Sequence, residues 1–362
     1  MFLSYDVSIV YEGFVILKAK PGAALTPMEI VGRDGLVALL CECLAHRSVL
    51  LSGERRIGKT SVLTKLVDAL EPRRVIRENV QAFASPVQFA EALGRWAGIE
   101  DLEVEWPSAI TLALDTIEDE APNAVIIWDE FTWMLKRIDE AHVQDEAVEL
   151  LLHLHRERLD RPSLRFVLSG SISIHTAIRR LRTRCTAKDP ISDLSEEIVR
   201  PLEAASALEL AHRISKGESL DASNLDEVLE QLVHLVQGRP YYIHDVLSAC
   251  ARRGDVTIAT IDEIVDERIS ADTWDLADDF GRIQDMFDES EGAAAVEILD
   301  WVAEAPMTRR EIASELEHSD GVVQSIIETL VRDELLTEVE TDLSFRSGLR
   351  ARAWRHYRSR NS

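Results

Sequence analysis

The chain has 362 residues, 65 of them acidic and 40 basic, which gives a formal net charge of −25 at pH 7. This length predicts two or three domains. The acidic balance argues against a nonspecific nucleic-acid coat, which needs a basic surface to displace counterions. No uncharged run reaches the roughly 18 residues of a membrane span. The four cysteines form no metal-binding pattern, so we expect reduced thiols and a cytoplasmic protein without a membrane partner.

Residues 1–26 form an N-terminal extension whose alternating apolar residues allow a β-hairpin. From Glu29 onward, helical patterns alternate with short apolar runs. The predicted strands are 48–52, 74–80, 124–128, 164–169 and one near Ile198, and the predicted helices are 34–45, 59–69, 87–96, 108–118 and 146–158. Parallel strands need crossover connections, so this alternation predicts an α/β fold with a parallel sheet over residues 27–201.

After Pro201 the pattern is helical only, with predicted helices at 204–215, 225–236, 242–252 and 260–269, and we assign 202–290 to a helical domain. Residues 291–362 have the element order of a winged helix, including the helix "TRREIASEL" with Thr308 as its N-cap. The third helix, within Asp320–Leu336, carries four acidic residues against Arg332 alone. Phosphates would repel such a helix, which favours a packing or partner-binding module over a DNA reader.

The last residues of the chain, "FRSGLRARAWRHYRSR", are basic instead. Six arginines alternate with Trp354 and Tyr357, and they are Arg346, Arg350, Arg352, Arg355, Arg358 and Arg360. Such a segment could contact nucleic acid. We favour the alternative that it docks on the acidic α/β domain of residues 27–201 of the same chain.

A glycine-bounded turn follows the first predicted strand of the sheet. "GERRIGKT" places Gly53, Gly58, Lys59 and Thr60 in the spacing of a phosphate-binding loop, between a strand and a helix. In such a loop, backbone N–H groups and the helix N-terminus bind phosphate oxygens. Lys59 is then expected to reach the β- and γ-phosphates and Thr60 to ligate Mg²⁺. The alternative is an ordinary strand–helix turn.

The run "AVIIWDEF" supplies the acidic partner that a nucleoside triphosphatase needs. Its apolar strand delivers Asp129 to the carboxyl edge of the sheet, where Asp129 is expected to hold Mg²⁺ through water and Glu130 to orient and deprotonate the attacking water. The next strand ends in Ser169, Gly170 and Ser171. A serine hydroxyl at that tip could sense the γ-phosphate, and a plain strand-ending turn is equally compatible.

Five segments in this order resemble the archaeal-type ATPase family, from the STAND branch of P-loop ATPases, which is related to AAA+ proteins. They are "IVGRDGLVALL", "GERRIGKTS", "IIWDEF", "LSGS" and "GRPYYI". The resemblance spans roughly Glu29 to Ile243. It implies a five-stranded sheet in the order 5-1-4-3-2, a helical lid and a C-terminal winged helix.

The resemblance also implies which residues surround an adenine nucleotide. Ile30, Val31, Gly32 and Arg33 would border the adenine, and Gly238 and Pro240 would lie in a lid motif that senses nucleotide. From the residues alone, "QGRPYY" is a helix stop followed by a proline-started helix, so a role for Arg239 stays open. Arg56 and Ser61 are counted among the nucleotide-binding residues.

One departure from the family concerns arginines. Family members often have a Gly-Arg pair after the fourth strand, and "DPISDLSEEIVRPLE" has no arginine at the expected place. The upstream cluster Arg179, Arg180, Arg182 and Arg184 could provide an arginine finger, and a solvated basic helix face is the favoured alternative. Hydrolysis is therefore expected to be slow. Arg55 or Arg56 is expected to contact the lid or a neighbouring subunit, with a local carboxylate as the alternative.

These features predict an ATP-binding switch that binds ATP or ADP with Mg²⁺, hydrolyses ATP slowly and acts on a protein partner or effector. A nucleotide-dependent homo-oligomer is also compatible with them. A DNA-loading ATPase similar to replication initiators or transposition regulators is the first alternative. A scaffold that uses nucleotide only structurally is the second.

Overall fold

The computed structural model describes residues 10–11, 14–99, 104–141, 145–170, 189–281, 283–333 and 335–361. The chain divides into two compact units. One consists of residues 24–200, and the other combines residues 1–23 with residues 201–362. Each unit is considered separately below.

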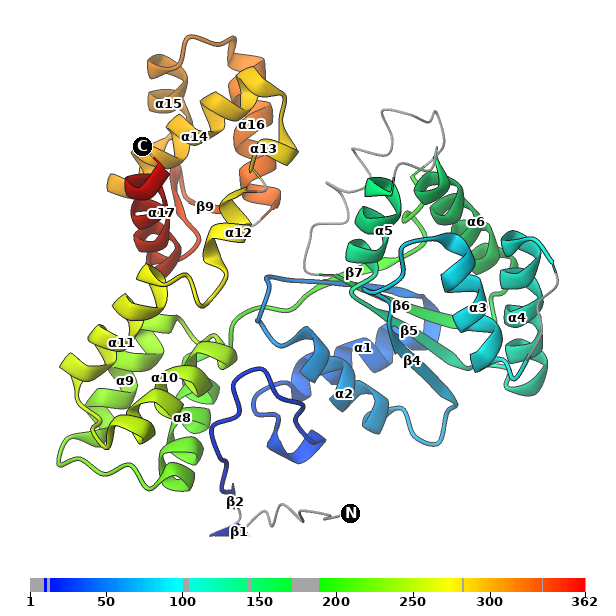
Figure 1. Ribbon diagram of the computed structural model, residues 1–362, viewed down its shortest axis with the longest axis horizontal. Helices are drawn as coiled ribbons and strands as arrows, with labels where there is room; N and C mark the ends of the chain where they lie inside the picture. The colour runs from blue at the N-terminus through cyan, green and yellow to red at the C-terminus, as the bar shows by residue number, and fades with distance from the viewer. Residues whose placement is uncertain are drawn as a thin grey trace. The chain divides into compact units, whose positions relative to one another are not determined.

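The unit of residues 24–200 is built on a five-stranded sheet (Figure 1). Its strands are β3 (Val49–Ser52), β4 (Val75–Asn79), β5 (Val125–Asp129), β6 (Arg165–Gly170) and β7 (Ser195–Ile198). They lie in the order β4-β5-β6-β3-β7, and every neighbouring pair is parallel. Counted along the chain and read from β7, this is 5-1-4-3-2, so the predicted sheet and strand order are confirmed.

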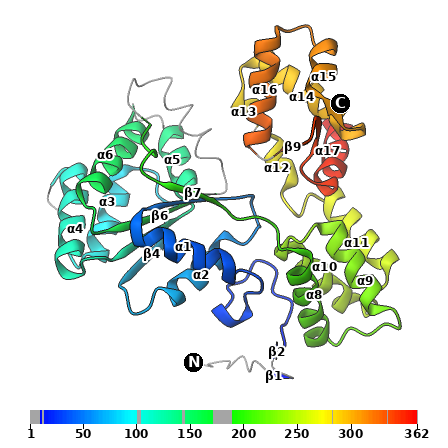
Figure 2. The same ribbon diagram turned by 180° about the vertical axis from the view of Figure 1, so that it is seen from behind.

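Helices cover both faces of this sheet (Figures 1 and 2). One face packs against α1 (Asp34–His46) and α2 (Lys59–Ala69). The other packs against α3 (Pro86–Trp96), α4 (Trp106–Glu120), α5 (Phe131–Glu140) and α6 (Glu146–Asp160). The sequence interpretation missed α5, although its apolar residues at 131, 134, 135 and 138 have helical spacing.

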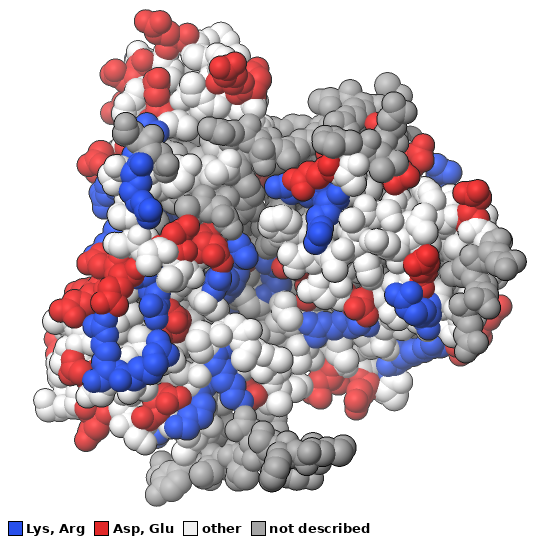
Figure 3. All heavy atoms as spheres, viewed as in Figure 1, with Lys and Arg blue, Asp and Glu red and all other residues white. Residues whose placement is uncertain are grey.

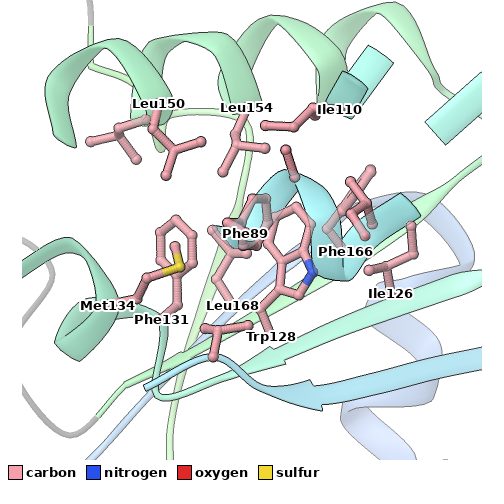
Figure 4. Packing of buried hydrophobic residues seen from close by; sticks show 14 of the residues in the cluster. Phe89, Ile110, Ile126, Trp128, Phe131, Met134, Leu150, Leu154, Phe166 and Leu168 are labelled. Carbon is pink, nitrogen blue, oxygen red and sulfur yellow. The ribbon is translucent and has the colours of Figure 1, made fainter. Parts of the chain in front are cut away.

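Trp128 is the centre of the larger core. Its ring lies 5.0 Å from that of Phe89, 5.9 Å from that of Phe131 and 5.5 Å from that of Phe166 (Figure 4). Along β5, Ile126 and Trp128 point into this core, while Val125 and Ile127 point into the core under α1 and α2. Side chains alternate between the faces of a strand, so the next residue, Asp129, faces α2.

The second unit begins with a short hairpin, β1 (Val10–Tyr11) antiparallel to β2 (Phe14–Val15), as the alternation predicted. The following segment lies along α8 (Ala204–Glu218), where the Leu17 N–H donates to the Arg213 carbonyl and the Ala19 N–H to Glu218. Three more helices follow, namely α9 (Leu225–Val236), α10 (Pro240–Arg253) and α11 (Ile258–Ser270).

The C-terminal part begins with α12 (Leu276–Gly281) and α13 (Ile283–Met286). Next come α14 (Glu289–Glu304), β8 (Met307–Thr308), α15 (Arg309–Glu315), α16 (Asp320–Arg332), β9 (Leu336–Val339), β10 (Asp342–Phe345) and α17 (Gly348–Asn361). The three strands form an antiparallel sheet in the order β8-β10-β9. From α14 to β10 this is the winged-helix order that the sequence predicts. Thr308 caps α15 in a capping box with Glu311.

Acidic side chains are exposed on α16, the third helix of the predicted winged helix. Figure 3 shows mainly acidic side chains at the end of the unit where α15 and α16 lie. Asp320 and Glu328 of α16 are exposed, as are Glu311 and Glu315 of α15. Arg309 is bound by both carboxylate oxygens of Glu338, at 2.7 and 2.9 Å. The same two helices also expose Arg310 and Arg332, so four acidic side chains lie among two basic ones, a balance that would weaken rather than favour attraction to a DNA backbone.

The arginines of α17 dock within their own unit. Arg358 donates to both oxygens of Asp300, Arg352 pairs with Asp266, and Arg355 and Arg360 donate to the carbonyls of Ala303 and Ser270. These partners belong to α11 and α14. The expectation that the tail docks on the α/β domain is therefore wrong for these four arginines. The acidic partners Asp266 and Asp300 lie 86 and 58 residues from their arginines along the chain, so it is the fold of this unit that brings them to α17.

No helix in the described part of the chain is long and apolar enough to cross a membrane. The three described cysteines, Cys41, Cys43 and Cys250, are free thiols. Cys185, Ser171 and the arginine cluster at 179–184 lie outside the described residues, so the predicted arginine finger stays a prediction.

Gly170 at the end of β6 provides a test of the packing. A Cβ at this position would lie 2.7 Å from Cγ2 of Thr132, in the first turn of α5, and closer still to its hydroxyl. Gly170→Ala should therefore lower the free energy of unfolding by about 1–3 kcal/mol, because α5 must shift to relieve the overlap. Urea denaturation measures this change.

Gly35→Ala is the matched control, because Gly35 is exposed in α1 and a Cβ there would meet nothing within 4 Å. Alanine inside an exposed helix should raise stability by about 0.5–1 kcal/mol. Equal unfolding free energies for Gly170→Ala and the unmodified protein would contradict the packing described.

Candidate nucleotide site

The turn between β3 and α2 has the backbone that a phosphate-binding loop requires. Gly58 is the N-cap of α2 and adopts φ 97°, a left-handed conformation that favours glycine. Gly53 packs against the end of β7, and a Cβ there would lie 2.9 Å from the Val199 carbonyl oxygen. The two glycines of the motif are thus required by conformation and by packing, respectively.

Lys59 is the first residue of α2 and is only 4 % exposed. Its ammonium donates to the carbonyls of Gly53 at 3.0 Å and Glu54 at 2.9 Å, both within the loop. These bonds close the loop around the lysine and fix the direction of its side chain. Ser61, in the same helical turn, is half-buried.

Arg33 holds the outer side of the loop. Its guanidinium donates to the Ile57 carbonyl at 2.9 Å and to the Arg200 carbonyl at 2.7 Å, two residues beyond β7. Burial lowers the pKa of Arg33 to about 10. The predicted contact of Arg33 with adenine remains a prediction, as do those of Ile30 and Val31, which are buried. What the structure adds is a contact of Arg33 with the loop itself.

Asp129 connects three elements at the carboxyl edge of the sheet. Its Oδ2 accepts a hydrogen bond from the Thr60 hydroxyl at 3.0 Å, and its Oδ1 accepts one from Ser169 at 2.9 Å. Asp129 is 1 % exposed and Ser169 is fully buried. The structure thus brings Thr60, Asp129 and Ser169 together. The Ser169 hydroxyl orients the carboxylate, an arrangement that neither sequence interpretation of this serine included.

Glu130 follows Asp129 in an unusual conformation. Its φ of 59° and ψ of 36° are left-handed, and it forms the N-cap of α5 without a side-chain capping bond. Such a conformation is uncommon for a residue with a Cβ and is frequent at functional sites. It turns the chain sharply after β5, so that Asp129 and Glu130 leave the strand end in different directions.

Arg77 is a member of the site that the sequence interpretation missed. It lies on β4, next to β5, and its Nη2 is 3.4 Å from Oδ2 of Asp129. The signal in the sequence is the strand "VIREN": Arg77 is on the same face of the strand as Val75, where an apolar residue would be expected. Such a cation has to find a partner when the strand is covered by a helix.

Some predicted site residues lie in the other unit. Gly238 adopts φ 66°, and a Cβ there would clash with the Leu202 carbonyl oxygen, while Pro240 starts α10. Arg239 is 4 % exposed and donates to Gln237. The predicted nucleotide contacts of Gly238, Pro240 and Arg56 remain predictions, and a role for Arg239 stays open. Arg55 is exposed and Arg56 half-buried in the loop, and the expected contact of one of them with the lid or a neighbouring subunit also remains a prediction.

Comparison with known proteins supports the identity of the fold. Residues 44–178 match the family model described as an AAA domain. The Walker-type ATPase PABY2304 of Pyrococcus abyssi has 17 % identity and a TM-score of 0.66, over 90 % of this chain and 96 % of that one. The Aeropyrum pernix ORC2 protein, in its ADPNP–ADP complexes, has 13 % identity and a TM-score of 0.59, over 92 % and 95 %. A search of curated proteins gave no match.

These findings show the fold of an AAA-like P-loop ATPase. The family match covers β3, the phosphate loop, β5 and β6, which are the elements that carry the site. The more specific resemblance to the STAND branch remains a prediction.

The two hydrogen bonds by which Arg33 holds the Ile57 and Arg200 carbonyls, which we call the Arg33 clamp, can be tested without nucleotide. Arg33→Met keeps most of the apolar stem and removes the donor from the buried Ile57 carbonyl and from the partly exposed Arg200 carbonyl, so we expect a loss of about 1–3 kcal/mol in the free energy of unfolding. Arg47→Met, at an exposed position just after α1, should change it by less than about 0.5 kcal/mol. Urea midpoints measure both, and equal effects of the two substitutions would contradict the clamp.

Proposed function

We propose that this protein is a Mg²⁺- and ATP-binding P-loop ATPase that acts as a nucleotide-dependent conformational switch. The observation that carries this proposal is the hydrogen-bonded set Thr60, Asp129 and Ser169 beside the loop closed by Lys59. A strand-ending turn with solvated carboxylates would not bury Asp129 and direct two hydroxyls at it.

The oxygen atoms at this edge suit magnesium. Among the residues that the structure describes, no group of three or more His, Cys, Asp or Glu side chains is arranged to hold a metal. Mg²⁺ is commonly held by one or two protein oxygens together with substrate phosphates and water. The Thr60 hydroxyl and the Asp129 carboxylate fit that role, and the ion would neutralise phosphate charge.

The remaining residues of the site have separate tasks. Lys59 exchanges its carbonyl partners for phosphate oxygens, and the N-terminus of α2 adds its positive dipole. Glu130 orients and deprotonates the attacking water. Turnover is expected to be slow because the arginine finger of related ATPases has no assigned counterpart here.

The switch role is supported by how the two chain crossings between the units are anchored. The chain crosses near residues 23–24 and again near residues 200–201. On the ATPase side of the first crossing, the Ile30 carbonyl accepts from Lys65 of α2. On the same side of the second crossing, the Val199 N–H donates to the Ser52 carbonyl, and Arg33 holds the Arg200 carbonyl.

Each of these anchors belongs to the phosphate loop, to its flanking elements or to Arg33, which also binds the loop. If phosphate displaces the loop, the hydrogen-bonded anchors at both connections to the second unit would therefore shift with it. The second unit, with its helices and winged helix, is the natural carrier of a docking site for a protein partner.

Nucleotide binding should depend on the Lys59 ammonium. Lys59→Ala is expected to abolish ATP binding in isothermal titration calorimetry, because a buried cation that neutralises phosphate is removed. Glu130→Gln is the matched variant: binding should remain, and phosphate release should fall at least tenfold.

The outcomes separate the candidate roles. Unchanged affinity in Lys59→Ala would contradict the proposed site. Turnover that is equal in Glu130→Gln and the unmodified protein would favour a scaffold that uses nucleotide only structurally.

The DNA-loading alternative predicts salt-sensitive binding of duplex DNA. The acidic exposed residues of α15 and α16 and the internal docking of the α17 arginines oppose it. In fluorescence anisotropy with duplex DNA at 50 and 200 mM salt, we expect no binding that weakens with salt. A steep decrease in affinity with salt would instead support the loader.

A further inference from the structure

The proposed switch assigns no task to Arg77, although its guanidinium contacts both expected metal-binding residues. Its Nη2 lies 3.4 Å from Oδ2 of Asp129 and donates to the Thr60 carbonyl at 3.0 Å. Its Nη1 donates to the Thr64 hydroxyl at 2.9 Å. One arginine thus joins β4 to the first turns of α2 and to the end of β5.

We propose that Arg77 is an internal counter-cation of Asp129, which keeps the Thr60–Asp129 pair assembled without metal and competes with the divalent cation for the carboxylate. This inference rests on the proposed nucleotide site and deepens it, because it concerns the metal dependence of that site. It makes Arg77 a positioning residue that sets metal affinity.

The first argument is the burial of the carboxylate. The Asp129 side chain is 2 % exposed, and a buried carboxylate is costly unless a cation or several donors compensate its charge. Thr60 and Ser169 donate neutral hydrogen bonds, and Arg77 adds a positive charge. The pair is thereby stabilised before any metal arrives.

The second argument concerns the shared oxygen. Oδ2 of Asp129 accepts the Thr60 bond and is also the atom nearest Arg77. A magnesium ion held by Thr60 and Asp129, directly or through water, would therefore share this carboxylate with the guanidinium. Two cations beside one carboxylate repel each other, and partial burial weakens the solvent screening between them.

The third argument is that Arg77 can yield. Its side chain is 24 % exposed, and two of its bonds go to α2 rather than to Asp129. When metal binds, the guanidinium can leave Asp129 and keep its bonds to Thr60 and Thr64. Metal binding then costs only the Arg77–Asp129 ion pair, and the hydrogen bonds that connect β4 to α2 are kept.

The predicted consequence is a shallow metal dependence. Because Arg77 already supplies positive charge at Asp129, the affinity for ADP in EDTA should be within about tenfold of that in saturating MgCl₂, a difference of about 1.4 kcal/mol. Removal of the Arg77 charge should make the metal dependence steeper. Without metal, ADP should bind less tightly than to the unmodified protein, and the metal itself should bind more tightly.

The test uses the full chain and calorimetric titration of ADP at a series of MgCl₂ concentrations. In Arg77→Gln, which keeps a hydrogen-bond donor for Thr64, the MgCl₂ concentration for half-maximal effect should fall at least tenfold. Arg77→Lys, which keeps the charge, should resemble the unmodified protein. Arg74→Gln is the matched control, because Arg74 lies just before β4 and pairs with Glu120 instead; it should change nothing.

Each other outcome overturns the inference. If the half-maximal MgCl₂ concentration is unchanged or higher in a folded Arg77→Gln, Arg77 only connects β4 to α2 and does not set metal affinity. The proposed nucleotide site is not contradicted by that result. If Arg77→Gln does not fold, the unmodified protein decides: a loss of more than about tenfold in ADP affinity on chelation contradicts a resident counter-cation. If the unmodified protein binds no ADP at all, the proposed function itself fails and this inference with it.

Discussion

The alternation of side chains along parallel strands is the constraint on which this site depends. Each residue before the site obeys it: Ile76 on β4, Trp128 on β5 and Leu168 on β6 all point into the core away from α2. The next residues, Arg77, Asp129 and Ser169, therefore share the opposite face, beneath α2. The β4–β5–β6 order makes their strands neighbours, so one face of the sheet presents a cation, a carboxylate and a hydroxyl to the helix that begins at the phosphate loop.

The energetics of that face favour a preassembled site. A buried carboxylate costs several kcal/mol in lost hydration, and a hydrogen bond to a charged group returns about 1.5–3 kcal/mol. Asp129 receives the Thr60 and Ser169 bonds as well as the Arg77 pair, which together are of the size needed to offset its burial. The orientation of Asp129 is thus fixed by the protein, and nucleotide binding need not order it.

Local sequence patterns were sufficient to predict the strands and the phosphate loop, and insufficient to predict which distant residues contact each other. The strand "VIIWD" and the loop "GERRIGKT" are predictable because their signal is contiguous, whereas the strand order came from family resemblance, since nothing local records which strands are neighbours. Arg77 was missed because its partner, Asp129, is 52 residues away. The α17 arginines were assigned the wrong partner for the same reason: charge alone does not say which acidic surface folds next to it.

The two connections between the units explain how a small change at the loop could have a large effect. On the far side of the first crossing, the N-terminal segment packs so closely on α8 that a Cβ at Gly217 would overlap the Leu17 backbone. On the far side of the second, the Leu202 N–H donates to the Gly238 carbonyl, in the motif expected to sense nucleotide. The second connection is thus fixed on both sides within a few residues, at Val199 and Leu202, so little slack is available there to absorb a shift of the loop. The anchors of the first connection, Ala19 and Ile30, are farther apart along the chain. In the proposed switch this coupling would be reciprocal: a partner that favours one arrangement of the second unit would change the affinity of the loop for nucleotide by the same factor by which nucleotide changes the affinity for the partner.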